Sequence, residues 1–431
     1  MQWLDNYFGI SAKGSTVKTE ALAGLATFLT MAYIIVVNPA ILSNAGLDFG
    51  SVFVATIIAA AVGTSIMGWW AKWPVALAPG MGLNAFFTFG VVLGMKQPWE
   101  VALGAVFVSG VLFLGLSLTG LREWVINSIP KSLKLGIGAG IGMFLAIIGL
   151  KNAGVVIDHP ATLVGLGDVS SLPVILFFAG FAVMAVLDKL RVPGGIVIGI
   201  LAASIVGWLT GAAEFGGVIG SVPSIEPTML KLDIAGALTA TMIGVVFALL
   251  FVDFFDTAGT LTSVANIAGK IGPDGKIENI GRAVISDSLA TIIGALFGTS
   301  NTTSYIESAA GIKEGGRTGL TAVVVAILFV LCLGFAPLAQ SIPAFATGAA
   351  LVFVATHFMR NLLDIDWDDA SEYAPAILGA ILMPLTFSIA NGIAIGFIAY
   401  AVIKIASGRI NEANPAVLFV AALGVAHYAF G

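Results

Sequence analysis

Three polar side chains lie inside apolar stretches, where a polar group is costly unless it has a task. Asp256 occurs in FVDFFDTAGTL, Glu307 in GTSNTTSYIESAAGIKEGG (298–316), and Asn84 just after the sequence PGMG. Ionisable residues in apolar spanning segments mark substrate or ion pathways. A carboxylate accepts two N–H bonds side by side, and an amide both donates and accepts. Together the three groups suit a planar solute rich in N–H donors and ring acceptors.

The acids of the first stretch share one face of the helix that carries them. Asp253, Asp256 and Thr260 are spaced i, i+3, i+7, which places them on one side of a helix. Asp256 lies 14 residues before Lys270, which is roughly 20 Å at the helical rise and so near the middle of a bilayer. Buried carboxyl groups are suited to taking up and releasing a proton during a transport cycle. We therefore expect Asp256, Glu307 and Asp253 to take part in proton coupling.

Each candidate also has a purely structural interpretation. Asp253 suits a cap or a bond to a neighbouring helix equally well, Asn84 suits a bond between helices, and Asp287 suits a structural partner. Aromatic side chains near the acids are suited to stacking on a ring, although aromatic side chains in apolar spans more often serve packing. The substrate-binding candidates are Glu307, Asp256, Asn84, Phe86, Thr260 and Ser308.

The composition excludes a soluble domain. The 431-residue chain is 58% hydrophobic and only 10% charged, whereas soluble domains carry about 25% charged residues. The three histidines are far apart in sequence, and the acids at 364–372 are typical of a solvated face. We therefore expect no metal site and no cofactor. The sequence predicts an all-α polytopic membrane protein.

The composition of the 298–316 stretch argues against a continuous lipid-facing helix, because the stretch is rich in glycine, serine and threonine. In hydrocarbon, irregular backbone survives only where it is buried in protein or lines a cavity. We predict an extended segment at Thr299–Tyr305 and the start of a half-helix at Glu307–Lys313. Glu307 would then lie at the positive end of a helix dipole and face a pocket. We also predict that Thr302–Tyr305 pairs with residues near Pro79–Gly82, the matching break in the first half.

Apolar runs predict fourteen transmembrane segments. They are 21–42, 51–70, 73–94, 101–120, 135–150, 172–187, 194–210, 234–269, 283–297, the broken 298–316 stretch, 320–338, 344–359, 373–389 and 393–405. The 234–269 run exceeds the roughly 20 residues that one span needs, so it must tilt or begin along the surface. Residues 122–134 are expected to be interfacial, and 416–430 to form a half-span or an interfacial helix.

Lysine and arginine follow the orientation of these segments. With the N-terminus in the cytoplasm, sixteen of the 19 fall inside and three fall outside, at Lys96, Lys151 and Lys231, as the positive-inside rule requires. Ser128-Ile129-Pro130 before segment five matches Ser341-Ile342-Pro343 before segment twelve, and each half has a broken third segment. Seven is odd, so the two copies run in opposite directions, which points to a secondary transporter with a site at the midplane.

Four motifs together resemble the AzgA-type purine permeases, within the nucleobase–cation symporter group that includes uracil and xanthine permeases. They are FGISAKGSTVKTEALAGLATFLTMAYIIVVNPAIL, APGMGLNAFF, VDFFDTAGTL and TSNTTSYIESAAGI, and the resemblance runs over essentially the whole chain. It implies 7+7 inverted repeats with broken third and tenth helices that carry short extended segments. It implies a core domain of 1–120 and 234–340, and a gate domain of 121–233 and 341–431.

The same resemblance implies an activity. It implies proton-coupled uptake of adenine, guanine or hypoxanthine by alternating access. The binding acids of the family fall on Asp256 and Glu307, and its third-span amide falls on Asn84. It also suggests a homodimer. Uracil-type relatives carry a histidine four residues after the eighth-span acid, where this chain has Thr260, so proton handling must rest on the carboxylates.

Other activities stay open at this point. An anion transporter, or a uracil or xanthine transporter, of the same architecture is the main alternative. A channel is a weaker one, because the polar groups cluster at one depth. No nucleophile–base pair or metal set supports an enzyme, and we expect no nucleic acid partner. Short loops favour a bacterial inner membrane with the N-terminus in the cytoplasm, Gly165 outside and Gly275 inside.

Overall fold

The computed structural model describes residues 2–119, 130–271 and 277–430. Within those ranges the chain is almost entirely helical, and nine helices are long and apolar enough to cross a membrane. The expected all-helical polytopic membrane fold is therefore confirmed. The predicted interfacial stretch 122–134 falls largely outside the described residues, as do Ser128-Ile129 and Gly275.

The elements follow the apolar runs of the sequence. In the first half the helices are α1 Gln2–Phe8, α2 Val17–Met31, α3 Ile34–Leu42, α4 Phe49–Ile66, α5 Met81–Ala85, α6 Trp99–Thr119, α8 Lys131–Asn152, α9 Leu172–Lys189 and α10 Gly195–Leu209. In the second half they are α11 Ile234–Ala237, α12 Ala240–Ile267, α13 Ile280–Phe297, α14 Ser308–Lys313, α15 Gly319–Leu331, α16 Ala336–Ser341, α17 Ala344–Met359, α18 Ala370–Leu385, α19 Ile389–Ala406 and α20 Pro415–Phe430. The strands are β1 Leu77–Pro79, β2 Val156–His159, β3 Leu163–Leu166 and β4 Thr302–Ser304.

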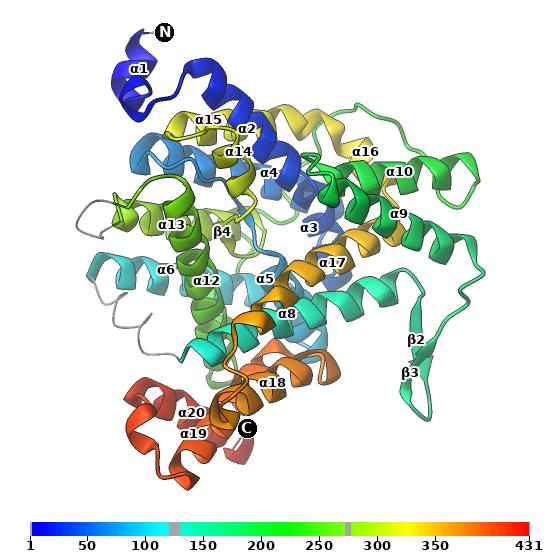
Figure 1. The fold of residues 1–431 in the computed structure, drawn as a ribbon. Helices are drawn as coiled ribbons and strands as arrows, with labels where there is room; N and C mark the ends of the chain where they lie inside the picture. The colour runs from blue at the N-terminus through cyan, green and yellow to red at the C-terminus, as the bar shows by residue number, and fades with distance from the viewer. Residues whose placement is uncertain (1, 120–129, 272–276, 431) are drawn as a thin grey trace.

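The two halves of the chain interleave rather than forming separate units (Figure 1). α2 packs on α14 and α15, α4 packs on α13 and α15, and α6 packs on α13. Further along the chain, α8 runs beside α17 and α18, and α9 packs on α10 and α17. Most of these contacts join a helix of the first half to one of the second. A largely apolar core fills the space between them.

The two halves of the chain are joined by a two-stranded sheet of β1 and β4, which we call the β1–β4 crossing. The strands are antiparallel, with Leu77 opposite Ser304 and Pro79 opposite Thr302. Bonds from Tyr305 N to Ala76 O and from Gly80 N to Asn301 O, each 2.9 Å, extend the pairing at either end. Because these backbone groups bond to each other, non-helical chain is tolerated at this depth.

The crossing confirms most of the predicted break and corrects its register. The extended segment is present at Thr302–Ser304, and α14 begins at Ser308 with Glu307 as its N-cap. The partner strand, however, ends at Pro79, whereas the sequence suggested Pro79–Gly82. The reason is that Gly80 is already the N-cap of α5, so the chain after it is helical.

Two other segments are broken where the sequence suggested simpler elements. The first predicted span is divided into α2 and α3, with Tyr33 at the junction. The long 234–269 run does not form one helix. It starts with α11, whose first turn is capped by Asp233 accepting from Gly236 N at 2.9 Å, and continues as α12. The continuous helix is thereby shortened to the 28 residues of α12, and the tilt or surface start of this run stays a prediction.

A hairpin appears where the sequence suggested only a loop. β2 and β3 pair antiparallel, with Val156 opposite Leu166 and His159 opposite Leu163, and the hairpin projects from the helices at the lower right of Figure 1. Its four-residue strands are too short to carry a clear alternation in the sequence. Among the described residues the hairpin and the β1–β4 crossing are the two sheets of the fold.

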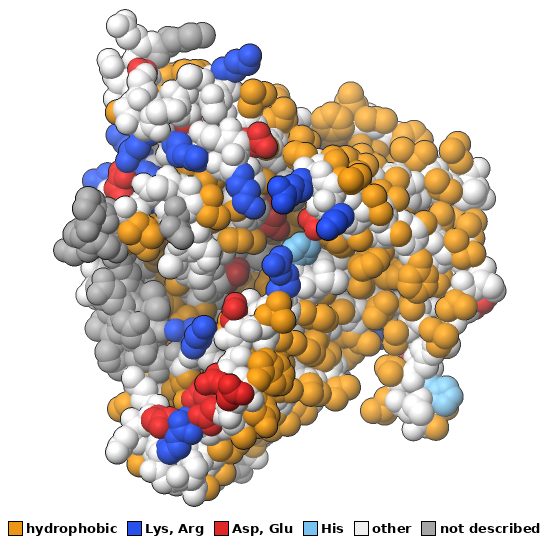
Figure 2. Space-filling model, viewed as in Figure 1, with side chains coloured by type: hydrophobic (Ala, Val, Ile, Leu, Met, Phe, Trp, Pro, Cys, Tyr) orange, Lys and Arg blue, Asp and Glu red, His pale blue; other side chains and the backbone are white. Residues whose placement is uncertain are grey.

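Charged side chains are unevenly distributed over the surface. In Figure 2 they gather over the left and central part of the face shown, near α1, α2 and the C-terminal helices, while the part formed by α9 and α10 is largely hydrophobic. Exposed apolar side chains on that part include Ile175, Phe178, Ile198 and Ile205. Such a continuous apolar surface suits contact with lipid.

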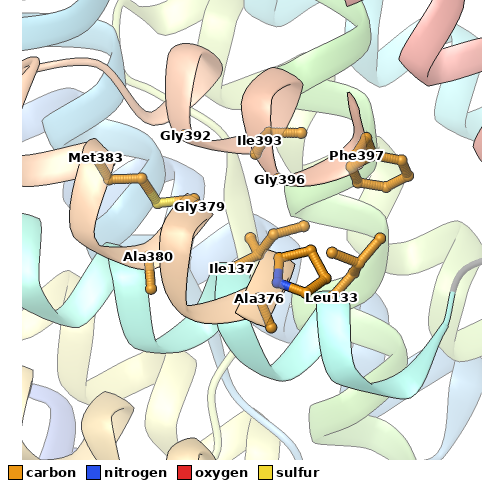
Figure 3. Close-up of a pocket in the computed structure, with 11 residues that line it drawn as sticks. Leu133, Ile137, Ala376, Gly379, Ala380, Met383, Gly392, Ile393, Gly396 and Phe397 are labelled. Atoms are coloured by element: carbon orange, nitrogen blue, oxygen red, sulfur yellow. The ribbon is translucent and has the colours of Figure 1, made fainter. Parts of the chain in front are cut away.

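A small gap between α8, α18 and α19 illustrates how tightly the remaining helices pack. Figure 3 shows Leu133 and Ile137 of α8 lying against residues of α18 and α19. Gly379 and Gly392 are among its lining residues and let the helix backbones approach closely. The gap measures about 10 Å³, which is room for at most one water molecule. It reflects helix packing and does not accommodate an organic ligand.

Candidate functional site

The predicted acids converge where α12 passes the β1–β4 crossing. β4 packs against α12 and α13, and α14 packs against α2 and α12. The hydroxyl and amide side chains of residues 299–304 are all buried. Buried polar groups need hydrogen-bond partners, and several of these side chains find them in the acids of α12 and α13.

Asp256 faces the extended segment directly. Its Oδ2 accepts a hydrogen bond from Thr303 Oγ1 at 3.1 Å, and the side chain is half buried. Within the described ranges this is its sole hydrogen bond to the protein. The carboxylate therefore keeps acceptor capacity for another partner.

Glu307 occupies the junction between the crossing and α14. Its Oε1 accepts a hydrogen bond from the hydroxyl of Tyr33 at 2.9 Å, and Tyr33 lies at the break between α2 and α3. In the part of the chain that the structure describes, neither Glu307 nor Asp256 is paired with a lysine or arginine. Among the described residues, the side chains that donate hydrogen bonds to the two carboxylates are hydroxyl groups, and both carboxylates remain suited to N–H donors or to a proton.

Ser308 serves the architecture of the site. It is fully buried, and its Oγ accepts a hydrogen bond from Ala76 N at 3.0 Å. This bond ties the start of α14 to the residue that precedes β1. The hydroxyl oxygen of this predicted binding residue is therefore already engaged in holding the two breaks together.

Asp253 and Asp287 support the extended segment from behind. Asp253 is 1% exposed, and its Oδ2 accepts hydrogen bonds from Thr291 Oγ1 at 2.9 Å and Asn301 Nδ2 at 2.8 Å. Asp287 is fully buried and accepts a hydrogen bond from Ser304 Oγ at 2.7 Å. These contacts match the structural interpretation of both residues, a bond to neighbouring elements.

Asn84 lies on α5 and makes no hydrogen bond to the acids among the described residues. It is fully buried, and its Nδ2 donates to Asn38 Oδ1 at 3.0 Å. Its helix, α5, nevertheless packs against α12, the helix of Asp256.

The remaining two candidates are enclosed by packing. Phe86 is 1% exposed and belongs to the main apolar core. Thr260 is buried one turn beyond Asp256 on α12. The other aromatic side chains near the acids also pack on one another. The rings of Phe251 and Phe255 are stacked at 6.2 Å, and the ring of Phe254 meets that of Phe255 edge-on at 5.6 Å.

Four residues of the site escaped prediction: Tyr33, Asn38, Asn301 and Thr303. Asn301 and Thr303 lie in the predicted break, so their segment was identified but not their individual partners. Asn38 precedes a proline inside an apolar run, and this combination of an amide and a helix-breaking residue was a usable signal. A tyrosine in an apolar run gives no such signal, so the role of Tyr33 emerges only from the fold.

Comparison with known proteins identifies relatives along the whole chain. Residues 18–395 match the Permease family model Xan_ur_permease. A putative permease of Methanocaldococcus jannaschii is 48% identical over 415 residues, which is 96% of this chain and 95% of that one. The adenine permease AdeP of Escherichia coli is 42% identical over 99% of this chain and 96% of its own. The guanine/hypoxanthine permease PbuG of Bacillus subtilis is 42% identical over 96% of each chain.

Solved structures of the same fold come from more distant proteins. The transmembrane domain of the cyanobacterial bicarbonate transporter BicA superposes with a TM-score of 0.67 at 14% identity, covering 86% of this chain and 96% of that domain. The murine anion transporter Slc26a9, in its inward-facing state, gives 0.69 at 10% identity, covering 94% of this chain and 72% of its own. The family match and the close relatives agree: this chain belongs to the Permease family and is an integral membrane transporter, not an enzyme.

Proposed function

We propose that this permease carries purine nucleobases, namely adenine, guanine or hypoxanthine, across the membrane in symport with protons. The observation that carries the proposal is the pair of carboxylates at the crossing, Asp256 and Glu307, whose partners are the hydroxyls of Thr303 and Tyr33. A purine base presents N–H donors and ring acceptors along a flat edge. Carboxylates without a cationic partner suit those N–H groups. The relatives named as adenine and guanine/hypoxanthine permeases support this substrate class.

Proton coupling follows from the charge of the same pair. Two carboxylates brought together without a lysine or arginine repel each other and are costly to keep ionised away from water. Uptake of one proton removes the repulsion, and a neutral base can then share the site. Asp256, with one hydroxyl partner, is the residue we assign to this exchange, together with Glu307. Asp253 is the third candidate for this exchange: two donors occupy its Oδ2, while its buried Oδ1 has no hydrogen-bond partner among the described residues and is available for a proton.

The transport cycle we propose is alternating access between a core and a gate domain. The core comprises 1–120 and 234–340, and the gate comprises 121–233 and 341–431, in a chain of fourteen segments arranged as 7+7 inverted repeats. The shared fold with anion transporters supports this architecture. The acids at the crossing disfavour an anion as substrate, because a carboxylate repels it. We further propose a bacterial inner membrane location, a cytoplasmic N-terminus and a homodimer.

The test is uptake of radiolabelled adenine and hypoxanthine by purified protein in liposomes, with an imposed pH gradient. The parent protein should concentrate the label when the outside is acidic, and an ionophore that dissipates the proton gradient should abolish accumulation. Uracil, xanthine and bicarbonate serve as competitors. Glu314→Gln changes an exposed acid just beyond α14 and serves as the matched control for Glu307→Gln, which changes the acid of the site. Uptake that bicarbonate blocks and purines do not would contradict the proposal.

A further inference from the structure

A chain of buried hydrogen bonds determines which way the amide of Asn84 points. It begins at Thr56 on α4, whose Oγ1 donates to Val52 O at 2.7 Å. A threonine hydroxyl has one hydrogen. Because that hydrogen is used on the helix, Thr56 Oγ1 acts as an acceptor toward Asn38 Nδ2, 2.7 Å away.

The bond to Thr56 also fixes the orientation of the Asn38 amide. The second hydrogen of its Nδ2 goes to Thr299 Oγ1 at 2.8 Å, so both N–H groups face α4 and the segment after α13. Its Oδ1 is consequently the atom that faces Asn84, and Asn84 Nδ2 donates to it at 3.0 Å. Asn38, Thr56, Thr299 and Asn84 are all fully buried, so water does not compete for these bonds.

The end of this chain is an acceptor without a partner. Asn84 Oδ1 is buried and has no hydrogen-bond partner among the described residues. A buried carbonyl left unpaired is unfavourable unless a ligand or a water molecule donates to it. The free acceptor thus lies on α5, a helix that packs against the helix of Asp256.

We propose that Asn38 is a positioning residue: it holds the amide of Asn84 so that Oδ1, and not the amino group, faces the transported base and accepts one of its N–H groups. This inference rests on the proposed function, since it concerns how the same site reads its substrate. The two ends of an amide are nearly equal in size, so shape alone does not choose between them. The hydrogen bonds from Val52 through Thr56 and Asn38 fix which end of the Asn84 amide faces the base.

The experiment measures equilibrium binding to detergent-purified protein with four probes: adenine, purine, which lacks the 6-amino group, hypoxanthine, in which the donors and acceptors of that edge are reversed, and 9-methyladenine, which lacks the ring N–H. If the 6-amino group faces Asn84, the parent should bind purine and hypoxanthine about tenfold more weakly than adenine; if the ring N–H faces it, 9-methyladenine should be the weaker ligand by the same factor. In Asn38→Leu, and in Thr56→Val, that discrimination should shrink to about twofold. Thr56→Ser keeps the hydroxyl and should retain the discrimination of the parent.

Several results would overturn the inference. One is a uniform loss of affinity for all four probes in Asn38→Leu and Thr56→Val, with their ratios unchanged, since a merely structural residue gives that pattern. Another is an effect of Thr56→Ser equal to that of Thr56→Val. If Asn38→Leu does not fold, Thr56→Val still decides, because both amides remain in place. A parent protein that binds none of the probes would instead refute the proposed function itself.

Discussion

At the scale of single residues, the hydrogen-bond partners of each acid indicate its role more clearly than its position in the sequence does. Asp253 and Asp287 each accept hydrogen bonds through Oδ2 at the back of the extended segment, from Thr291, Asn301 and Ser304. Asp256 and Glu307 each have one hydroxyl partner. All four acids stood out in the sequence, because charge is rare in apolar runs. The division between them depends on donors that come from other segments, and those the sequence does not specify.

We predict that Glu307→Gln weakens purine binding about tenfold or more at every pH. The substitution keeps the shape but replaces one acceptor oxygen with an NH₂ group, which repels the N–H of a base and leaves buried groups unpaired, at about 1–3 kcal/mol. Binding of labelled adenine over a pH series checks it. Tyr33→Phe, which removes only the hydroxyl that contacts Glu307, should have a smaller effect. Affinity that recovers fully at low pH in Glu307→Gln would contradict the prediction.

We predict that Asp256→Asn separates binding from coupling. The variant loses a titratable group but keeps a side chain that accepts from Thr303, so purine exchange should persist while accumulation against a gradient is lost. Counterflow measured beside gradient-driven uptake in the same vesicles distinguishes the two activities. If Asp256→Asn concentrates purine as the parent does, with the same pH dependence, Asp256 is structural and protons move elsewhere.

For whole elements, secondary structure could be predicted from the sequence wherever a segment pairs its own backbone hydrogen-bonding groups, as a helix does. It was predicted less well where those groups pair with another segment. Apolar runs indicated nearly every long helix, and the glycine and hydroxyl content of 298–316 indicated the break. The partner of Thr302–Tyr305 was predicted near Pro79–Gly82, whereas the strand lies at Leu77–Pro79, because the chain is already helical from Met81. The split between α2 and α3 was missed because no glycine or charge marks it.

The end of α13 offers a test of how strictly the break must be placed. Gly298 has φ +98°, and a Cβ there would overlap Thr228, whose hydroxyl donates to Phe297 O at 3.1 Å. Gly298→Ala should therefore lower the melting temperature and reduce uptake, since backbone strain of about 1–2 kcal/mol adds to the overlap. Gly211→Ala is the matched control, with φ +75° but open space around it. Equal melting temperatures for the two variants would show that the overlap relaxes at no cost.

Considered as a whole, the molecule carries a cluster of ion pairs among its C-terminal helices, made by residues other than the acids of the crossing. Lys404 is fully buried and pairs with Glu372 at 2.8 Å and Glu412 at 2.7 Å, and Arg409 pairs with Asp369 at 2.7 Å. Hydrogen bonds from Ser371 and Arg409 hold the pKa of Asp369 at about 2. This cluster joins the helix that begins at Ala370 to the one that ends at Ala406.

The lowered pKa of Asp369 fixes the sign of its pH dependence. A carboxyl group with a depressed pKa in the folded state stabilises that state above its ordinary pKa, and the contribution is lost only as the pH falls toward 2. Between about pH 5 and 8 the pair with Arg409 stays ionised. We therefore predict that Arg409→Gln lowers thermal stability but leaves the pH profile of uptake over that range unchanged. A shifted profile would assign part of the proton dependence to this cluster.

The orientation of the molecule yields one further prediction. In a background in which Cys332, the single native cysteine, is replaced by Ser, Gly165→Cys in the β2–β3 hairpin should react with an impermeant maleimide added outside intact cells. Ser407→Cys, exposed just beyond α19, should react only after the cells are opened. The reverse pattern would invert the membrane topology inferred from the lysine and arginine distribution.

The β1–β4 crossing also has a consequence for how the protein is made. Residues 77–79 bond to residues 302–304, so the first strand leaves the ribosome long before its partner exists. At roughly 5–20 residues per second, the wait is on the order of 10–45 seconds. Until then its backbone donors and acceptors must form hydrogen bonds with water, with the insertion machinery or with another segment of the chain. Biogenesis of this protein therefore includes an obligatory late step, in which the second half arrives to complete the first.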